Sequence, residues 1–80
     1  MVVIKNLVDV TRFFKYLAEK RKVAFHPDDD FESYVNIETG EPTFTPDECK
    51  VYNNAMQQCF EVCEEKGVDI YLIGLDILTN

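Results

Sequence analysis

One stretch of the chain, residues 45–67, carries both the start and the stop signals of a long helix. Thr45 can accept a hydrogen bond from a free backbone N–H of the first turn, and Pro46 suits the first helical position. Glu48 stands three residues after Thr45, the spacing of a capping box. Gly67 can adopt the left-handed conformation that closes a helix. We therefore predict a single long helix here, around which the rest of the chain must pack.

The same stretch separates its apolar and polar residues when it is wound at 100° per residue. The apolar stripe consists of Cys49, Tyr52, Met56, Cys59, Phe60 and Cys63. The opposite side holds Lys50, Asn53, Asn54, Gln57, Gln58, Glu61, Glu64 and Glu65. The pattern predicts a broad buried face and a hydrogen-bonding, acidic surface. As a candidate surface for a partner we take Asn53, Asn54, Gln57, Glu61 and Glu64.

A second amphipathic helix is predicted over residues 7–21. Asn6 is a suitable cap, with Asp9 in a box-like position three residues later. One arc of this helix carries Leu7, Val10, Phe13, Phe14, Leu17 and Ala18. Two helices with aromatic-rich stripes are expected to pack against each other.

The residues between these helices contain turn signals rather than a long periodic pattern. Pro27 precedes an acidic run, which suits the first turn of a short helix near residues 29–35. Residues 34–37 can instead pair with residues 43–44 across the turn that Gly40 and Pro42 favour. Both arrangements are consistent with the sequence.

The segment that follows Gly67, VDIYLIGLDILTN, is apolar on nearly every side. Its β-branched residues favour a buried strand, whereas Asp69 is a plausible helix cap. In either form, the segment must be central in the core or covered by a second chain.

These elements predict a single domain over residues 1–80 that is mainly α, with two long amphipathic helices and shorter C-terminal and linking elements. If the last segment is a strand, the alternative is an α+β sandwich with the split βαβ order of a ferredoxin-like fold. We prefer the helical form because the first and third strands of the alternative are hard to place. A core of this size is small, so a dimer is expected.

The net charge of −7 is unevenly distributed along the chain. Residues 1–23 hold six of the eight basic residues, and thirteen of the fifteen acidic residues follow them. The acidic total opposes nucleic-acid binding, since phosphates would be repelled. The absence of a long apolar run argues against membrane insertion, and the first ten residues lack the basic start of a signal peptide. Three cysteines without such a signal predict reduced thiols and a cytoplasmic location.

The cysteines are the residues most suggestive of chemistry. Cys49 and Cys59 would lie about 15 Å apart along a helix, too far to share one metal ion. Cys59 and Cys63 are one turn apart and could act with His26 in a thiol- or metal-dependent activity. We expect instead that all three cysteines are packing groups, because they lie on the apolar stripe. We therefore predict no bound cofactor or metal and no enzymatic activity.

The function best supported at this point is a small, acidic, cytoplasmic protein-interaction module or accessory subunit, with a protein partner and most simply a homodimer. An alternative is an acidic regulator that occupies the nucleic-acid-binding site of a protein target. That alternative expects one exposed face to gather Asp28, Asp29, Asp30, Glu32, Glu38, Glu41, Glu61, Glu64 and Glu65.

Overall fold

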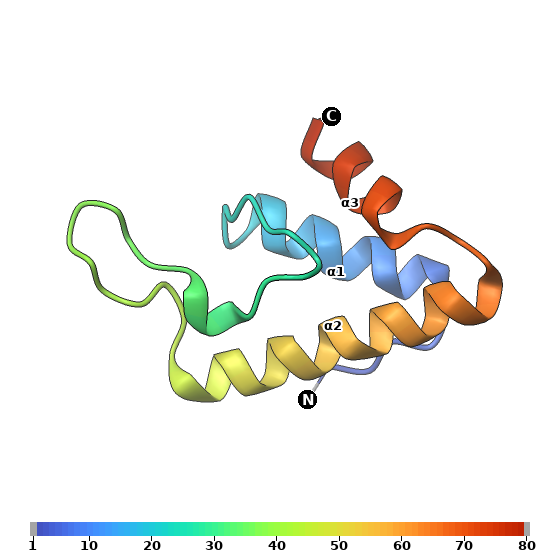
Figure 1. Ribbon diagram of the computed structural model, residues 1–80, viewed down its shortest axis with the longest axis horizontal. Helices are drawn as coiled ribbons and strands as arrows, with labels where there is room; N and C mark the ends of the chain where they lie inside the picture. Colours follow the sequence, from blue (N-terminus) through green and yellow to red (C-terminus); the bar gives the residue numbers. More distant parts are fainter. Residues whose placement is uncertain (1, 80) are drawn as a thin grey trace.

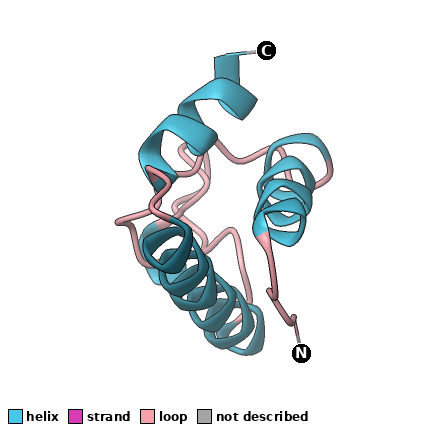
Figure 2. Ribbon diagram, turned by 90° about the vertical axis from the view of Figure 1, so that its right-hand side faces the viewer, coloured by secondary structure: helices cyan, strands magenta, loops and turns pink. Residues whose placement is uncertain are grey.

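The computed structural model describes residues 2–79, which form three α-helices and one turn of 3-10 helix. These elements are α1 (Leu7–Glu19), η1 (Phe31–Ser33), α2 (Pro46–Lys66) and α3 (Ile70–Thr79). Viewed from one end, the three α-helices surround a common centre (Figure 2). The mainly helical prediction is confirmed, and the ferredoxin-like alternative is wrong for residues 2–79, which contain only an isolated β-bridge.

The predicted capping of α2 is confirmed at both ends. The Thr45 hydroxyl accepts a hydrogen bond from the Glu48 N–H at 3.1 Å, and the Glu48 carboxylate accepts one from the Thr45 N–H at 3.0 Å. At the other end, Gly67 has a φ of 67° and its N–H contacts the carbonyls of Cys63 and Glu64. The local sequence therefore determines the length of this helix.

The first helix begins where the sequence predicts and ends two residues early. The Asn6 side chain accepts a hydrogen bond from the Asp9 N–H at 2.9 Å. Beyond Glu19 the chain turns back, with Lys22 in the left-handed region at a φ of 55°. This turn brings Phe25 onto Phe14, with ring centroids 4.7 Å apart. The Val23 N–H donates to the Leu17 carbonyl at 3.1 Å, so this turn closes α1 and lets Phe25 pack back on it.

Aromatic rings occupy the space between α1, α2 and the linking segment, which comprises residues 20–45. Phe31 lies at the centre of one group, with its ring centroid 5.3 Å from that of Phe44 and 5.4 Å from that of Tyr52. Phe13 extends the group from α1, with 6.0 Å between its centroid and that of Tyr52. Buried among these elements are the side chains of Cys49, Cys59 and Cys63. The prediction that the cysteines are packing groups is confirmed.

The ambiguous C-terminal segment is a helix that lies on α1 and α2 rather than at the centre of the core (Figure 1). The Asp69 carboxylate accepts a hydrogen bond from the Tyr71 N–H at 2.9 Å, as predicted for a cap. Ile70 and Gly74 are buried, whereas Leu72, Leu75 and Leu78 are 63%, 59% and 40% exposed. Within residues 2–79, no helix is both long and apolar enough to cross a membrane.

The linking segment combines the two arrangements that the sequence allowed. Within the helix predicted near residues 29–35, only η1 is helical. The Thr43 N–H then donates to the Tyr34 carbonyl at 2.9 Å, and Val35 forms an antiparallel bridge with Pro42. The loop between them projects from the end of the molecule (Figure 1).

Substitution by alanine of Gly67, which caps α2, and of Gly74, which lies within α3, should have opposite effects on stability. Gly67→Ala should lower the free energy of unfolding by about 1 kcal/mol, because the left-handed backbone is unfavourable for alanine. Gly74→Ala should raise it by up to about 1 kcal/mol, because alanine is the better helix former and its Cβ would lie 3.5 Å from Phe25, an ordinary contact. Urea unfolding followed by circular dichroism measures both; equal effects of the two substitutions would contradict this account.

Candidate functional site

The polar face of α2 has two parts, and one part holds the fold together. The Asn53 side chain accepts a hydrogen bond from the Phe31 N–H at 3.0 Å and donates to the Glu32 carboxylate at 3.1 Å. Asn54 accepts a hydrogen bond from Gln58 at 2.8 Å. Asn53 is half-buried and tied to η1, whereas Asn54 is exposed, as predicted, and its bond to Gln58 lies within α2.

Gln58 links α2 to the start of the chain. Its side-chain oxygen accepts a hydrogen bond from the Ile4 N–H at 2.9 Å, and its nitrogen donates to the Val2 carbonyl at 2.9 Å. The amide therefore pairs with extended backbone as a neighbouring strand would. This role was not evident from the helical pattern, which shows only that Gln58 lies on the polar side.

The remaining predicted surface residues, Gln57, Glu61 and Glu64, are exposed. Gln57 and Glu64 lie on either side of Phe60 along α2, at spacings of three and four residues that place all three on one side of the helix. Glu61 lies on the adjacent side. The structure therefore leaves part of the predicted surface available, centred on a residue that the sequence assigned to the apolar stripe.

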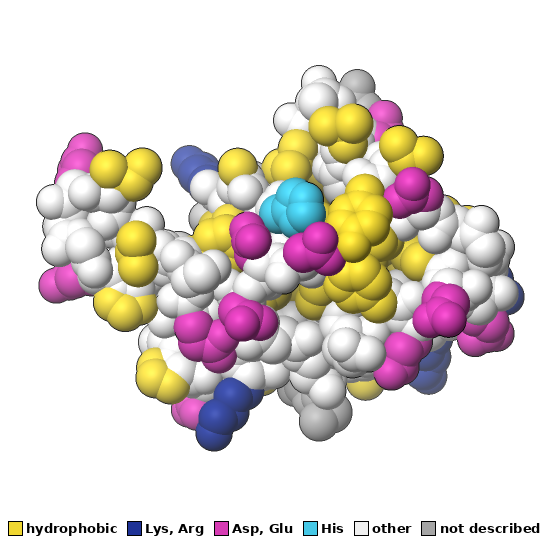
Figure 3. Space-filling view, in the orientation of Figure 1, with side chains coloured by type: hydrophobic (Ala, Val, Ile, Leu, Met, Phe, Trp, Pro, Cys, Tyr) yellow, Lys and Arg dark blue, Asp and Glu magenta, His cyan; other side chains and the backbone are white. Residues whose placement is uncertain are grey.

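Phe60 belongs to a surface aromatic cluster formed by His26, Phe60 and Tyr71. The ring centroids of Phe60 and Tyr71 are 6.3 Å apart in an edge-to-face arrangement, and those of His26 and Tyr71 are 5.8 Å apart. The three rings come from the loop after α1, from α2 and from α3. Figure 3 shows the histidine near the centre of one face, beside hydrophobic side chains and with carboxylates on several sides.

Hydrogen bonds through Asp28 orient two of these rings. The Tyr71 hydroxyl donates to the Asp28 carboxylate at 2.7 Å, and the Asp28 N–H donates to His26 Nδ1 at 3.2 Å. The hydrogen bond to the carboxylate raises the pKa of Tyr71, so the phenol stays protonated at neutral pH. The cluster is therefore held in one arrangement before any ligand binds.

A shallow hollow lies on each side of Phe60. One, of about 330 Å³, is bordered by Asp28, Asp30 and Gln57. The other, of about 320 Å³, is bordered by Glu64, Asp69 and Tyr71. Neither hollow is lined by a lysine or an arginine, so both have an acidic rim beside an aromatic wall.

The residues considered for thiol or metal chemistry differ in burial. Cys59 is fully buried, and burial raises its pKa to about 12, so the thiol is protonated and unreactive at neutral pH. His26, in contrast, is exposed and packs on Tyr71. Within the described part of the chain, no group of three or more His, Cys, Asp or Glu side chains is arranged to hold a metal ion.

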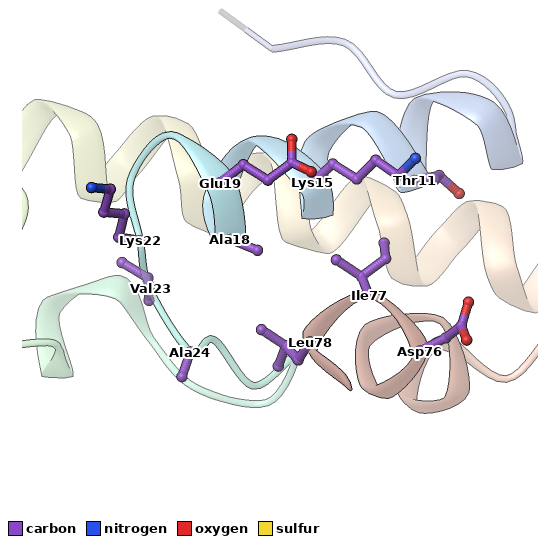
Figure 4. Close-up of a pocket in the computed structure, with 10 residues that line it drawn as sticks. All are labelled: Thr11, Lys15, Ala18, Glu19, Lys22, Val23, Ala24, Asp76, Ile77 and Leu78. Atoms are coloured by element: carbon purple, nitrogen blue, oxygen red, sulfur yellow. The ribbon is translucent and has the colours of Figure 1, made fainter. Parts of the chain in front are cut away.

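A larger hollow lies between the end of α1, the turn that follows it and the end of α3 (Figure 4). It has a volume of about 730 Å³ and is lined by Lys15 and Lys22 as well as by Glu19 and Asp76. Apolar side chains, including Ile77 and Leu78, line the remainder. Because both signs of charge are present, this hollow does not favour a ligand of either charge.

A further hollow of about 490 Å³ is mainly apolar and lies between the start of the chain, α1 and α2. The hydroxyls of Tyr16 and Tyr52 meet at its edge, 3.3 Å apart. Hydrogen bonds with Tyr52 and Arg21 lower the pKa of Tyr16, whereas burial raises that of Tyr52 to about 12. Arg21 also pairs with Glu48 and covers the Phe44 ring, 4.8 Å from its centroid. These contacts join α1 to the start of α2. The polar groups of Tyr16, Tyr52 and Arg21 therefore have a structural role here.

Comparisons of the chain with protein-family models, with curated proteins and with solved structures found no match.

The surface aromatic cluster could not be found from the pattern of one helix. Phe60 lies at the edge of the α2 stripe, next to Gln57 and Glu64, which is a weak sign of partial exposure. Tyr71 and His26 belong to segments whose positions depend on how α3 and the loop after α1 fold back. Only their packing brings the three rings together.

We predict that Asn53 and Gln57 differ in their contribution to stability although both lie on the polar side of α2. Asn53→Ala should lower the free energy of unfolding by about 1–2 kcal/mol, because it leaves the Phe31 N–H without its acceptor. Gln57→Ala, at an exposed position, should change it by less than about 0.5 kcal/mol. Urea unfolding of both variants is the measurement, and an equal loss would contradict a structural role for Asn53.

The buried thiol of Cys59 should make the protein less stable at alkaline pH. Its folded pKa of about 12 lies above the ordinary 9.0, so its contribution is complete below pH 9 and is lost as the pH rises toward 12. At pH 10, this thiol alone should lower the free energy of unfolding by about 1 kcal/mol relative to neutral pH. Urea unfolding at neutral pH and at about pH 10 measures the loss.

Cys59→Ala is the control for the thiol. It is needed because the pKa of Tyr52 is also raised, to about 12, so this phenol also lowers the free energy of unfolding in the same pH range. The variant should be less stable at neutral pH but should show a smaller decrease on going to alkaline pH. An unchanged decrease would assign the pH dependence to the other groups.

Proposed function

We propose that this chain is a small protein-interaction module without catalytic activity, which self-associates through α3. The observation that carries the proposal is the leucine face, formed by Leu72, Leu75 and Leu78. Leu72 and Leu75 lie about 60° apart on the side of α3 away from Ile70, whereas Leu78 lies one turn after Gly74 and borders the hollow beside α1. Exposed apolar patches on small proteins commonly mark interaction sites.

A second copy of the chain is the partner that fits this face most simply. The leucines themselves carry no charge, but Asp69 at the cap of α3 and Asp76 within it lie beside Leu72, so self-association brings carboxylates near the interface. Three leucines supply only part of the roughly 800 Å² per partner found in a stable interface. We therefore propose a weak homodimer, or an accessory subunit whose leucine face is covered by a larger partner.

The proposed cytoplasmic location rests on the reduced state of the cysteines. All three are free thiols buried in the core, where they act as small apolar groups. The proposal that the module lacks catalytic activity is supported by the burial of Cys59 and by the absence of any charged partner that would lower its pKa.

Replacing two leucines of the face by glutamine tests the proposal. The double variant Leu72→Gln and Leu75→Gln should sediment as a monomer at concentrations where the natural chain self-associates, because it removes apolar area without adding charge. Self-association of the natural chain should strengthen between about 0.05 and 0.5 M salt, since each copy carries a net charge of −7.

Ile37→Gln is the matched control, since Ile37 is 99% exposed and lies on the projecting loop. This variant should self-associate like the natural chain. A natural chain that remains monomeric at millimolar concentration, or an equal effect of the control, would refute self-association through the leucine face.

A second candidate function is an acidic regulator of a nucleic-acid-binding protein. It is favoured by the contacts of the acidic loop, residues 28–32, with the helices. Glu32 is hydrogen-bonded to Asn53 of α2, and Asp28 is hydrogen-bonded to Tyr71 of α3. Tyr71, which donates to Asp28, borders the same hollow as Glu64, whereas Glu38 and Glu41 lie on the projecting loop. The acidic surface is smaller than the sequence suggested.

This second candidate predicts that the chain displaces a fluorescent DNA duplex from an arginine-rich peptide, because its carboxylates compete with the phosphates. Anisotropy of the duplex measures the displacement. Retention of the duplex by the peptide at a large excess of the chain would reject this candidate.

A further inference from the structure

We propose that the surface aromatic cluster of His26, Phe60 and Tyr71, with the acidic hollows on each side of Phe60, binds an arginine-bearing segment of a protein partner. This inference rests on the proposed role as an interaction module and identifies the chemistry of a partner. It uses a different surface from the leucine face, although Tyr71 borders both.

The first argument is the composition of the site. Exposed aromatic rings attract cations at their faces, and arginine adds stacking of its planar guanidinium group. The hollow on one side supplies Asp28 and Asp30, and the hollow on the other supplies Glu64 and Asp69. Because no lysine or arginine of the chain lines either hollow, these carboxylates have no basic neighbour there. The charge of the site is therefore complementary to a basic segment.

The second argument is the fixed arrangement of the rings. Tyr71 is 44% exposed, yet its hydroxyl is held by Asp28 at 2.7 Å and its ring packs against both other rings of the cluster. A carboxylate has several acceptor positions, so Asp28 can receive a guanidinium N–H while keeping its bond to Tyr71. Binding of a ligand would therefore cost little conformational entropy in these side chains.

The third argument distinguishes this partner from others. A nucleic acid would be repelled by the four carboxylates at the rims. A purely apolar segment would leave those carboxylates facing it without a partner, at a cost in desolvation. A segment that carries arginines can stack its guanidinium groups on the rings and donate hydrogen bonds to the carboxylates.

A labelled hexa-arginine peptide is a suitable probe, with its anisotropy measured at about 0.15 M ionic strength. The natural chain should bind it with a dissociation constant below about 1 mM. Tyr71→Leu should weaken binding by about two- to fivefold, because it keeps the apolar bulk but removes the aromatic face. Tyr71→Phe, which keeps the ring, should retain more affinity than Tyr71→Leu.

The charge of the site is tested by a matched pair of substitutions. Asp28→Asn and Glu38→Gln each remove one negative charge, but Glu38 lies on the projecting loop and outside both hollows. Asp28→Asn should weaken binding of the peptide more than Glu38→Gln does. Equal effects of the two, or binding by Tyr71→Leu equal to that of the natural chain, would overturn the proposal, since the attraction would then come from net charge alone.

Salt and sedimentation separate this proposal from self-association. Binding of the peptide should weaken as salt is raised, whereas self-association through the leucine face should strengthen. The Leu72→Gln, Leu75→Gln variant should lose self-association and still bind the peptide. The Asp28→Asn variant should bind the peptide more weakly and still self-associate. Loss of peptide binding in the leucine variant would overturn the assignment of two separate surfaces.

Discussion

The structure depends on the burial of aromatic side chains between α1, α2 and the segment that joins them. Phe31 contacts both Phe44 and Tyr52, while Phe14 contacts Phe25, so both ends of the linking segment are packed against a helix. In so small a domain, few other groups can supply the apolar area that offsets the entropy of ordering the chain. The three cysteines of α2 are buried in the same core, where they act as small apolar groups.

Polar side chains then hold the irregular segments to this core. Asn53 binds the backbone at η1, and Gln58 binds the backbone of residues 2–4. Both are amides, which offer a donor and an acceptor and so can pair with an otherwise unpaired peptide group. The polar face of α2 therefore has a structural part, at Asn53 and Gln58, and an exposed part beside Phe60.

The two surfaces proposed for interaction both follow from the way α3 packs. Because α3 rests on α1 and α2 with Ile70 and Gly74 inward, its leucines face solvent and Tyr71 lies against Phe60 and His26. The bond from Tyr71 to Asp28 joins the last helix to the acidic loop. Tyr71 and the leucines therefore lie on neighbouring parts of the surface of one helix.

The sequence by itself determined the elements whose signals are local. The caps at Asn6, Thr45 and Gly67 depend on nearby backbone, and the apolar stripes of α1 and α2 depend on helical spacing, so both could be predicted. The end of α1, the helical form of residues 70–79 and the aromatic cluster at the surface could not. Each depends on contacts between residues distant in sequence, such as Phe14 with Phe25 and Phe60 with Tyr71. Only the tertiary structure decides such contacts, because a pattern along one segment does not specify which other segment will cover it.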